Sequence, residues 1–228
     1  FGPIWRGVND SKNLTPKTYT MAFRLGTYIA TQFKPIVAKT IYNMTDAKTI
    51  LDTSMGWGDR LTAFYASNAT HYIGCDPNPN TFARYQKMID FYDKLTGGKK
   101  TVQMYNCGAE DLPWDDISDV DCAFTSPPYF STERYNEGGD KEELQSGFKF
   151  NEYESWRDNF YLPVSQNTFD SLSDTGVMMI NILDPKVKGK RYRSGDELVD
   201  MLLPHFMGQV GMRLSLIHIS EPTRRDQI

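Results

Sequence analysis

A hydroxyl, two prolines and an aromatic ring follow a short apolar segment and carry the first chemical signal. Residues 120–124 are apolar except for one aspartate and are typical of a buried strand. Pro127 and Pro128 end this strand, because neither offers an N–H and each fixes its own φ. Ser126 and Tyr129 are therefore presented in a fixed relation at a strand's carboxyl end, where ligands bind in open α/β sheets. The alternative is a plain turn with a packed tyrosine.

Two acids end two earlier strand-like segments and give the second signal. Asp52 follows residues 49–51 and precedes a Gly-Trp-Gly turn at 56–58, while Asp76 follows residues 71–75. A glycine turn lets the backbone approach a ligand closely, and an acid after the second strand can bind ribose hydroxyls. Asp52 suits a cationic group, such as the ammonium or sulfonium of S-adenosylmethionine. The pattern favours a nucleoside-bearing cofactor over a turn that only packs a helix.

The elements that position these residues alternate between strand and helix. The predicted strands are 49–54, 71–75, 101–106, 120–124 and 176–182, and residues 209–213 could begin a sixth. The predicted helices begin at Pro35, after Gly58 and at Pro79, where Asn78 is the expected cap. This alternation predicts an α/β fold with a doubly wound, mostly parallel sheet.

The second half of the chain is expected to hold a loop, a kinked helix and a basic cluster. Residues 131–150 are polar and predict a lid or substrate loop. A helix should start near Asn151 with Glu154 in a capping pair and bend at Pro163, and residues 195–206 also read as helical. The cations that follow the fifth strand could bind phosphates or form a solvated loop, and they are Lys186, Lys188, Lys190, Arg191 and Arg193.

Composition narrows the class of protein. The 228 residues carry a net charge of −4, so nucleic-acid binding would be local rather than spread over the surface. No run in the given residues approaches the length of a membrane span or shows a signal pattern, and three scattered histidines give no metal pattern. Cys75, Cys107 and Cys122 are widely spaced, which predicts reduced thiols in a cytoplasmic protein.

One domain is expected over residues 1–213, with both ends of the native chain missing. Residues 214–224 resemble the translation of a transposon sequencing adapter, and residues 214–228 are therefore treated as a non-native tail. The carboxyl-terminal strand of the fold would then be missing or replaced by this tail.

The motifs resemble those of S-adenosylmethionine-dependent DNA amino-methyltransferases of the N4-cytosine/N6-adenine group, and most closely the compact phage-type methylases. The likeness rests on Asp52-Thr-Ser-Met-Gly-Trp-Gly-Asp-Arg60, Gly74-Cys-Asp-Pro-Asn78 and Thr125-Ser-Pro-Pro-Tyr-Phe130, and it spans about residues 25–213. The residues that it assigns to the cofactor are Phe33, Lys34, Asp52, Thr53, Ser54, Gly56, Trp57, Gly58, Asp76, Pro77, Ala109 and Glu110.

The resemblance implies that Ser126, Pro127, Pro128 and Tyr129 are catalytic. Ser126 and the Pro127 carbonyl would accept the N–H groups of an exocyclic amine, while Tyr129 stacks on a base rotated out of the duplex. No covalent intermediate is needed, and Cys122 lies within the strand, which disfavours C5-cytosine chemistry. One departure is Gly108, which stands where many relatives carry an acid for the adenine amine. Backbone groups at Gly108 and Ala109, or Glu110, would substitute.

Two other functions remain open at this point. One keeps the cofactor but methylates guanine N2 in structured RNA or a protein amide, for which Asp or Asn usually replaces the serine at 126. The other is a non-catalytic nucleotide-binding module, in which the Ser-Pro-Pro-Tyr turn is packed away from Asp52 and Asp76. The first interpretation implies DNA as partner, in a bacterial or phage-infected cell, with the target left open between cytosine N4 and adenine N6. It also leaves open a restriction-modification role.

Overall fold

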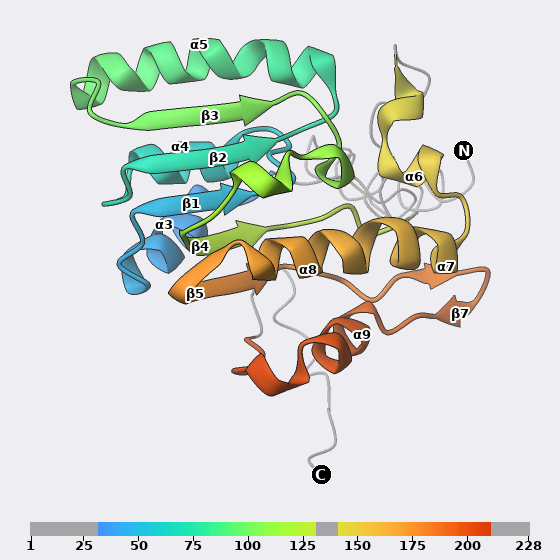
Figure 1. The fold of residues 1–228 in the computed structure, drawn as a ribbon. Helices are drawn as coiled ribbons and strands as arrows, with labels where there is room; N and C mark the ends of the chain where they lie inside the picture. Colours follow the sequence, from blue (N-terminus) through green and yellow to red (C-terminus); the bar gives the residue numbers. More distant parts are fainter. Residues whose placement is uncertain (1–31, 131–140, 211–228) are drawn as a thin grey trace, which may run out of the picture.

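The computed structural model describes residues 32–130 and 141–210, and within these ranges five strands form one parallel sheet (Figure 1). The strand order is β3-β2-β1-β4-β5. The strands are β1 (Thr49–Asp52), β2 (His71–Cys75), β3 (Thr101–Tyr105), β4 (Val120–Thr125) and β5 (Leu172–Ile180). The order reverses between β1 and β4, as in doubly wound Rossmann-like sheets, so the carboxyl ends of these strands flank a crevice. The predicted fold class is confirmed.

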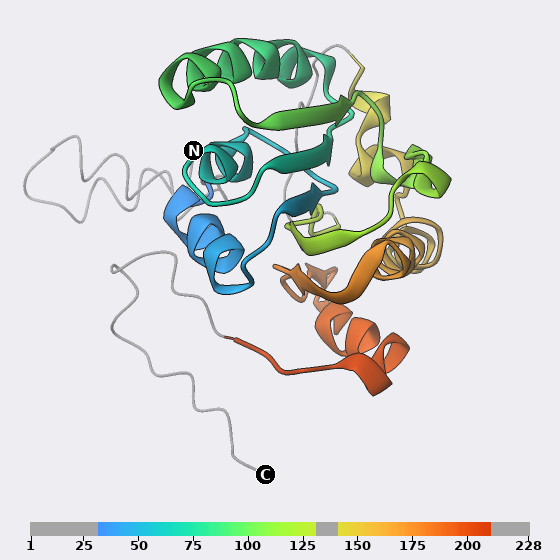
Figure 2. The same ribbon diagram turned by 60° about the vertical axis from the view of Figure 1, so that its left-hand side comes forward.

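Helices cover both faces of the sheet (Figure 2). On one face lie α3 (Pro35–Met44), α4 (Asp59–Tyr65) and α5 (Pro79–Thr96); on the other lie α7 (Tyr153–Trp156), a π-helical turn η4 (Arg157–Tyr161) and α8 (Leu162–Asp170). Each face has its own apolar core. Tyr42 and Phe64 are fully buried on the first face, and the Trp156 ring stacks on Tyr161 at 4.8 Å on the second. Two packed layers therefore hold the strand ends in place.

The first half of the chain follows the predicted capping signals. Asn78 caps α5 by accepting hydrogen bonds from the backbone N–H groups of Asn80 and Thr81, with Pro79 as the first helical residue. Apolar side chains near the carboxyl ends of α3 and α5 are exposed, with Met44 at 79% and Leu95 at 67%. In α3 the buried residues are Ala38 and Tyr42, so the apolar side chains at its ends point outward.

Strand bounds differ most at the fifth strand. β5 begins at Leu172, four residues before the predicted start, and ends at Ile180, two before the predicted end. Its pairing with β4 shifts between Val120 and Cys122, so an irregularity in register accommodates the additional residues. β1 and β3 also end slightly early, at Asp52 and Tyr105. The polar residues after β1, β4 and β5 consequently stand just beyond the sheet.

The expected capping pair and the proline kink of the next helix take other forms. The cap residue of α7 is Glu152, and it makes no side-chain capping bond, so the predicted pairing of Asn151 with Glu154 is wrong. The π-helical turn ends two residues before Pro163, which has no N–H to continue the α-helical ladder. A widened turn thus replaces the predicted bend and places Phe160 and Tyr161 in the core.

Residues 142–149 are helical rather than loop-like. They form η3 (Glu142–Leu144) and α6 (Ser146–Lys149), and residues 131–140 lie outside the described ranges. Two short 3₁₀ turns follow β3, η1 (Ala109–Asp111) and η2 (Trp114–Asp116). A segment of regular structure therefore borders the crevice, where a lid or substrate loop was predicted.

The basic cluster folds as a hairpin of β6 (Lys186–Val187) and β7 (Lys190–Arg191), followed by α9 (Ser194–Met201) and η5 (Leu203–His205). Gln209 and Val210 are not in a strand, and the remainder of the predicted sixth strand and the tail lie outside the described residues.

The three cysteines are free thiols, with Cys75 and Cys122 buried and Cys107 half-buried. Over residues 32–130 and 141–210, no His, Cys, Asp and Glu side chains gather in a group that could hold a metal ion. No helix in these ranges combines the length and apolar character needed to cross a bilayer.

Candidate functional site

One cavity of about 200 Å³ lies at the carboxyl ends of the strands and collects most of the predicted site residues. Those that line it are Phe33, Thr53, Ser54, Gly56, Trp57, Asp76, Pro77, Ala109, Glu110, Ser126, Pro128 and Tyr129. The residues 126–129 after β4, called the proline corner below, and the glycine turn at 56–58 after β1 thus border the same cavity. Asp52, Gly58 and Lys34 do not line it, and neither do the cations of the β6–β7 hairpin.

The proline corner is anchored by the residue that follows it. Phe130 adopts a left-handed backbone conformation with φ of 50° and donates its N–H to the Pro128 carbonyl at 2.9 Å. Its ring is 3% exposed and packs against Tyr153 and Trp156 at 5.8 and 5.9 Å between centroids. This buried ring fixes the end of the corner and thereby the position of Tyr129.

Pro127 occupies a different place from the one predicted. It is buried and lines a separate void of about 10 Å³ together with Thr53 and Thr125, and it does not line the main cavity. The side chains on either side of it in the corner, Ser126 and Pro128, do line the cavity. Pro127 therefore packs next to the main cavity without lining it.

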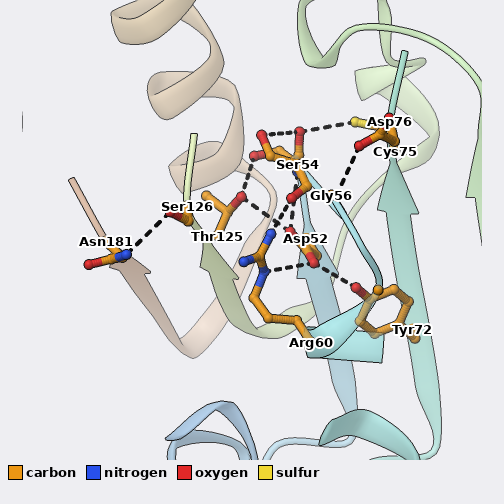
Figure 3. A network of polar contacts seen from close by, with 12 residues as sticks. Asp52, Ser54, Gly56, Arg60, Tyr72, Cys75, Asp76, Thr125, Ser126 and Asn181 are labelled. Atoms are coloured by element: carbon orange, nitrogen blue, oxygen red, sulfur yellow. Dashed lines mark hydrogen bonds and ion pairs between the residues drawn. The ribbon is translucent and has the colours of Figure 1, made fainter. Parts of the chain in front are cut away.

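A polar cluster at the corner joins Ser126 and Tyr129 to Asn181. Asn181 Nδ2 donates to the Ser126 hydroxyl at 3.2 Å (Figure 3). It also donates to the Tyr129 hydroxyl at 2.7 Å, and the two hydroxyl oxygens are 2.7 Å apart. The Asn181 backbone N–H also donates to the Thr125 carbonyl at 3.0 Å, which continues the β4–β5 pairing beyond the strand. Asn181 thus stands beside Ser126 and holds both hydroxyls at the cavity wall.

Asp52 is turned away from the cavity into a buried network (Figure 3). One carboxylate oxygen accepts from Arg60 Nε at 2.9 Å and from the Tyr72 hydroxyl at 2.6 Å. The other accepts from the Thr125 hydroxyl and the Ser54 N–H, both at 3.2 Å. Four protein donors therefore fill its acceptor sites. The prediction that Asp52 faces a cationic ligand group is corrected, because Arg60 already supplies the cation.

Arg60 connects this network to the cavity wall. Burial by itself would lower the pKa of Arg60, but the adjacent Asp52 carboxylate raises that pKa above its usual value. The guanidinium also donates to the Ser54 carbonyl and lies 5.6 Å from the centre of the Phe33 ring. Arg60 lines the cavity, so a neutralised ion pair and an aromatic ring form its base.

The glycine turn is held from both sides. Gly56 and Gly58 have φ of 55° and 82°, in the left-handed region that favours glycine. The Gly56 N–H donates to Asp76 at 2.9 Å, and its carbonyl accepts from the Tyr85 hydroxyl. Gly58 caps α4 and packs on the α5 side of the turn, away from the cavity. The turn therefore brings the Gly56 backbone alongside the Asp76 carboxylate.

Asp76 is 8% exposed and lines the cavity. Burial raises the pKa of Asp76 to about 6, although N–H donation from Asn78 and Gly56 partly opposes that effect. Each carboxylate oxygen accepts one backbone N–H at 2.9 Å, and the Tyr85 hydroxyl beside the carboxylate also lowers the pKa of Asp76. When ionised, this carboxylate has acceptor capacity for a ligand hydroxyl.

Glu110 takes the space left by Gly108. A Cβ at position 108 would overlap the Glu110 carboxylate where it now lies, so a larger residue there would displace that carboxylate. Glu110 Oε1 pairs with Lys149 Nζ at 2.6 Å, and Lys149 also contacts Asp111 at 3.4 Å. This sequence has glycine at position 108, where the enzymes it resembles carry an acid, and the Glu110 carboxylate from two residues later lies on the cavity wall instead.

Several residues of the cavity wall were not predicted from the sequence. They are Gln32, Met55, Asp59, Arg60, Asn78, Thr81, Leu144, Gln145, Ser146, Phe160 and Asn181. Asn181 could have been found, because it is a polar residue directly after an apolar strand, as Asp52 and Asp76 are. Gln145 and Ser146 carry no comparable signal, since their segment shows no strand or helix periodicity.

No protein-family model and no curated protein matches this sequence. Structural comparison finds an rRNA methylase from Streptococcus thermophilus, at 13% identity over 76% of this chain and 81% of that one, with a TM-score of 0.47. An S-adenosylmethionine-dependent O-methyltransferase from Thermotoga maritima is 13% identical over 81% of this chain and 55% of that one, also with a TM-score of 0.47. A methyltransferase from Podospora anserina, bound to S-adenosylhomocysteine, is 13% identical over 78% of this chain and 61% of that one, with a TM-score of 0.42. The chain spans less than two thirds of the length of the last two proteins.

Proposed function

We propose that this protein transfers a methyl group from S-adenosylmethionine to the exocyclic amine of cytosine or adenine in DNA. The supporting observation is the single cavity that Ser126, Tyr129 and Asn181 share with Gly56 and Asp76. A nucleoside-binding acid and a corner that could hold an amine thereby open onto the same space. The sequence motifs that resemble the amino-methyltransferases come from these same positions.

The cavity residues fit the proposed cofactor. Asp76 would bind the ribose hydroxyls, the Gly56 turn would lie along the ribose and methionine portion, and Glu110 would accept from the adenine amine. Buried polar atoms with no partner among the described residues support a ligand here, and one of them is Glu110 Oε2. When bound, S-adenosylmethionine supplies an electrophilic methyl group beside the corner.

The corner residues would act by positioning and polarisation. The lone pair of an exocyclic amine is conjugated with the base ring, so the nitrogen is a poor nucleophile until its geometry changes. Ser126 Oγ would accept one N–H of this amine, and Asn181 would hold the hydroxyl in place. The Tyr129 ring would stack on the extruded base. Pro127 would support the corner from beneath.

Transfer of labelled methyl to different acceptors tests this function. The chain, supplied with labelled S-adenosylmethionine, is expected to label duplex DNA and to leave structured RNA and protein unlabelled. Ser126→Ala serves as the paired loss-of-activity variant, and Ser173→Ala, outside the cavity, serves as the matched control. Label that enters only RNA or protein would reject DNA as the substrate and would favour the guanine-N2 or amide alternative.

Cofactor binding should depend on pH through Asp76. Below about pH 6 this carboxyl becomes protonated, because burial raises its pKa, and it then loses acceptor capacity for the ribose hydroxyls. The Kd for S-adenosylhomocysteine is therefore expected to be constant above pH 7 and to rise by up to about tenfold per unit below pH 6. Calorimetry across this range checks the expectation. Asp76→Asn should bind weakly at every pH; a wild-type slope in that variant would contradict the assignment.

The β6–β7 hairpin supports a role for an anionic partner. Lys188 and Gly189 both have positive φ and form its tight turn, and Lys186 pairs directly with Arg191 across it. Like charges directly opposite each other destabilise a hairpin, and a phosphate between them would remove that cost. Lys190 and Arg193 already have carboxylate partners in Glu154 and Asp196. Lys186, Lys188 and Arg191, which have no ion pair with a described residue, are thus the proposed phosphate contacts.

The salt dependence of DNA binding tests the hairpin. Replacing Lys186 and Arg191 by Gln is expected to reduce the slope of log K against log salt by about 2, since each phosphate contact contributes about 0.9. The loss should be similar for different DNA sequences. Lys99→Gln is the control, because Lys99 precedes β3 at the opposite edge of the sheet. An unchanged slope in the double variant would show that the hairpin is only a solvated loop.

A further inference from the structure

Three residues that line the cavity each carry a buried side-chain atom with no hydrogen-bond partner within residues 32–130 and 141–210. These atoms are Glu110 Oε2, Gln145 Nε2 and Ser146 Oγ. Buried polar groups in folded proteins nearly always have partners, so three such atoms on one wall point to a ligand that supplies them. Ser146 is only 6% exposed, which keeps bulk water from serving this purpose. The three atoms offer an acceptor, a donor and a hydroxyl that can act as either.

One structural unit holds the acceptor and the donor together. The Gln145 carbonyl accepts the N–H groups of Phe148 and Lys149 at 2.9 and 3.0 Å, which forms the turn that opens α6. Lys149, at the end of this turn, holds Glu110 Oε1 at 2.6 Å. Glu110 therefore keeps Oε2 for a ligand, while the same turn presents Gln145 to the cavity. The Lys149–Glu110 contact fixes the segment after β4 to the loop after β3.

The polar groups on this part of the cavity favour the neutral edge of a heteroaromatic ring as their ligand. Lys149 is taken by Glu110 and Asp111, and Arg60 is taken by Asp52 and Ser54, so no uncommitted cation on the described wall awaits a phosphate or carboxylate. The Glu110 carboxylate can accept an N–H, and the Gln145 side-chain amide can donate to a ring nitrogen. The adenine edge offers such a pair in its amino group and N1.

We propose that Gln145 and Ser146, on the segment after β4, complete an adenine-specific subsite with Glu110. Gln145 donates to N1 of the adenine of S-adenosylmethionine, and Glu110 accepts from its amino group. The Ser146 hydroxyl makes a third hydrogen bond at the same edge. The inference rests on the proposed function in taking S-adenosylmethionine as the ligand of this cavity. It assigns a cofactor role to a segment that the sequence associates with the target, and it makes the Lys149–Glu110 contact part of cofactor recognition.

Calorimetry with two ligands of opposite hydrogen-bond pattern tests the subsite. S-adenosylhomocysteine has an amino donor and an N1 acceptor, whereas S-inosylhomocysteine has an oxygen acceptor and an N1–H donor at the same positions. The wild-type chain is expected to bind the adenine ligand about 100-fold more tightly, because both contacts are mismatched in the other. Gln145→Ala should weaken binding of the adenine ligand about tenfold. Combining Glu110→Gln with Gln145→Glu should reverse the preference.

Two matched controls separate this role from charge and folding effects. Asp111→Asn removes the same charge as Glu110→Gln and also contacts Lys149, but it lies off the cavity wall; Glu143→Ala alters an exposed neighbour of Gln145. Both should bind like wild type, and thermal melting verifies that every variant is folded.

The outcomes distinguish the two proposals. The subsite alone would be overturned if the wild-type chain binds the adenine ligand, Gln145→Ala binds it with unchanged affinity, and the double exchange does not reverse the preference. A Gln145→Ala variant that binds the cofactor normally but has a raised KM for DNA would also overturn it, because the contact would then belong to the target base. No binding of either ligand by the folded wild-type chain would overturn the proposed function and the subsite together.

Discussion

Replacing Tyr129 by Ala is expected to lower kcat/KM for DNA by at least about 100-fold while the affinity for S-adenosylhomocysteine stays within about twofold of wild type. The ring is proposed to stack on the extruded base, an interaction that contributes about 1–3 kcal/mol. Loss of the ring also frees the base to leave the position in which its amine can react. Methyl-transfer kinetics and calorimetry on the same preparation measure the two quantities.

Tyr129→Phe is the control that separates the ring from its hydroxyl. It keeps the stacking surface and removes the contacts at 2.7 Å to Ser126 and Asn181, so a loss of no more than about tenfold is expected. If Tyr129→Ala instead abolished cofactor binding, the ring would belong to the cofactor site. Equal activity losses in the Ala and Phe variants would assign the effect to the hydroxyl cluster rather than to stacking.

Replacing Arg60 by Met is expected to lower the free energy of unfolding by about 3–5 kcal/mol, because it leaves the Asp52 charge buried without its cation. The side chains of this pair are 6% and 0% exposed, and their atoms are 2.9 Å apart. In a chain of this size such a loss lowers the Tm by about 10 °C. Denaturant unfolding monitored by circular dichroism measures the change.

A second arginine provides the matched control. Arg157 pairs with Asp158 and Glu197, but its side chain is 30% exposed, so Arg157→Met should cost less than about 1 kcal/mol. Combining Asp52→Asn with Arg60→Met should recover part of the lost stability, since no unpaired charge then remains buried. If Arg60→Met and Arg157→Met lowered the free energy of unfolding by the same amount, the buried Asp52–Arg60 pair would not stabilise the structure more than an exposed ion pair does.

The sheet could be predicted because its strands are short apolar segments that each end in a polar residue. β1, β2 and β4 follow that pattern at Asp52, Asp76 and Ser126, and the parallel order follows from the helices between them. β5 was harder, because an irregular register with β4 lets its first residues pair outside the apolar segment. The bend expected at Pro163 became a π-helical turn for a similar reason, since hydrogen-bond register depends on tertiary packing.

The site could be predicted where a residue type implies a contact in its own segment, and not where the partner is distant in sequence. Gly56 and Asp76 were expected to meet at a ligand, and both line the cavity. Asp52 also looked available, but Arg60 and Tyr72, from different elements, fill its acceptor sites. Gln145 lines the cavity on a segment that Lys149 attaches to Glu110, and nothing in the local sequence indicates that contact.

Mass spectrometry of nucleosides from DNA incubated with the chain and S-adenosylmethionine tests the central claim most directly. If the corner after β4 holds an exocyclic amine beside the cofactor, the digest will contain N4-methylcytosine or N6-methyladenine, and Ser126→Ala will remove that product. A digest containing only 5-methylcytosine, or an unmodified digest from a folded chain that binds S-adenosylhomocysteine, would contradict it.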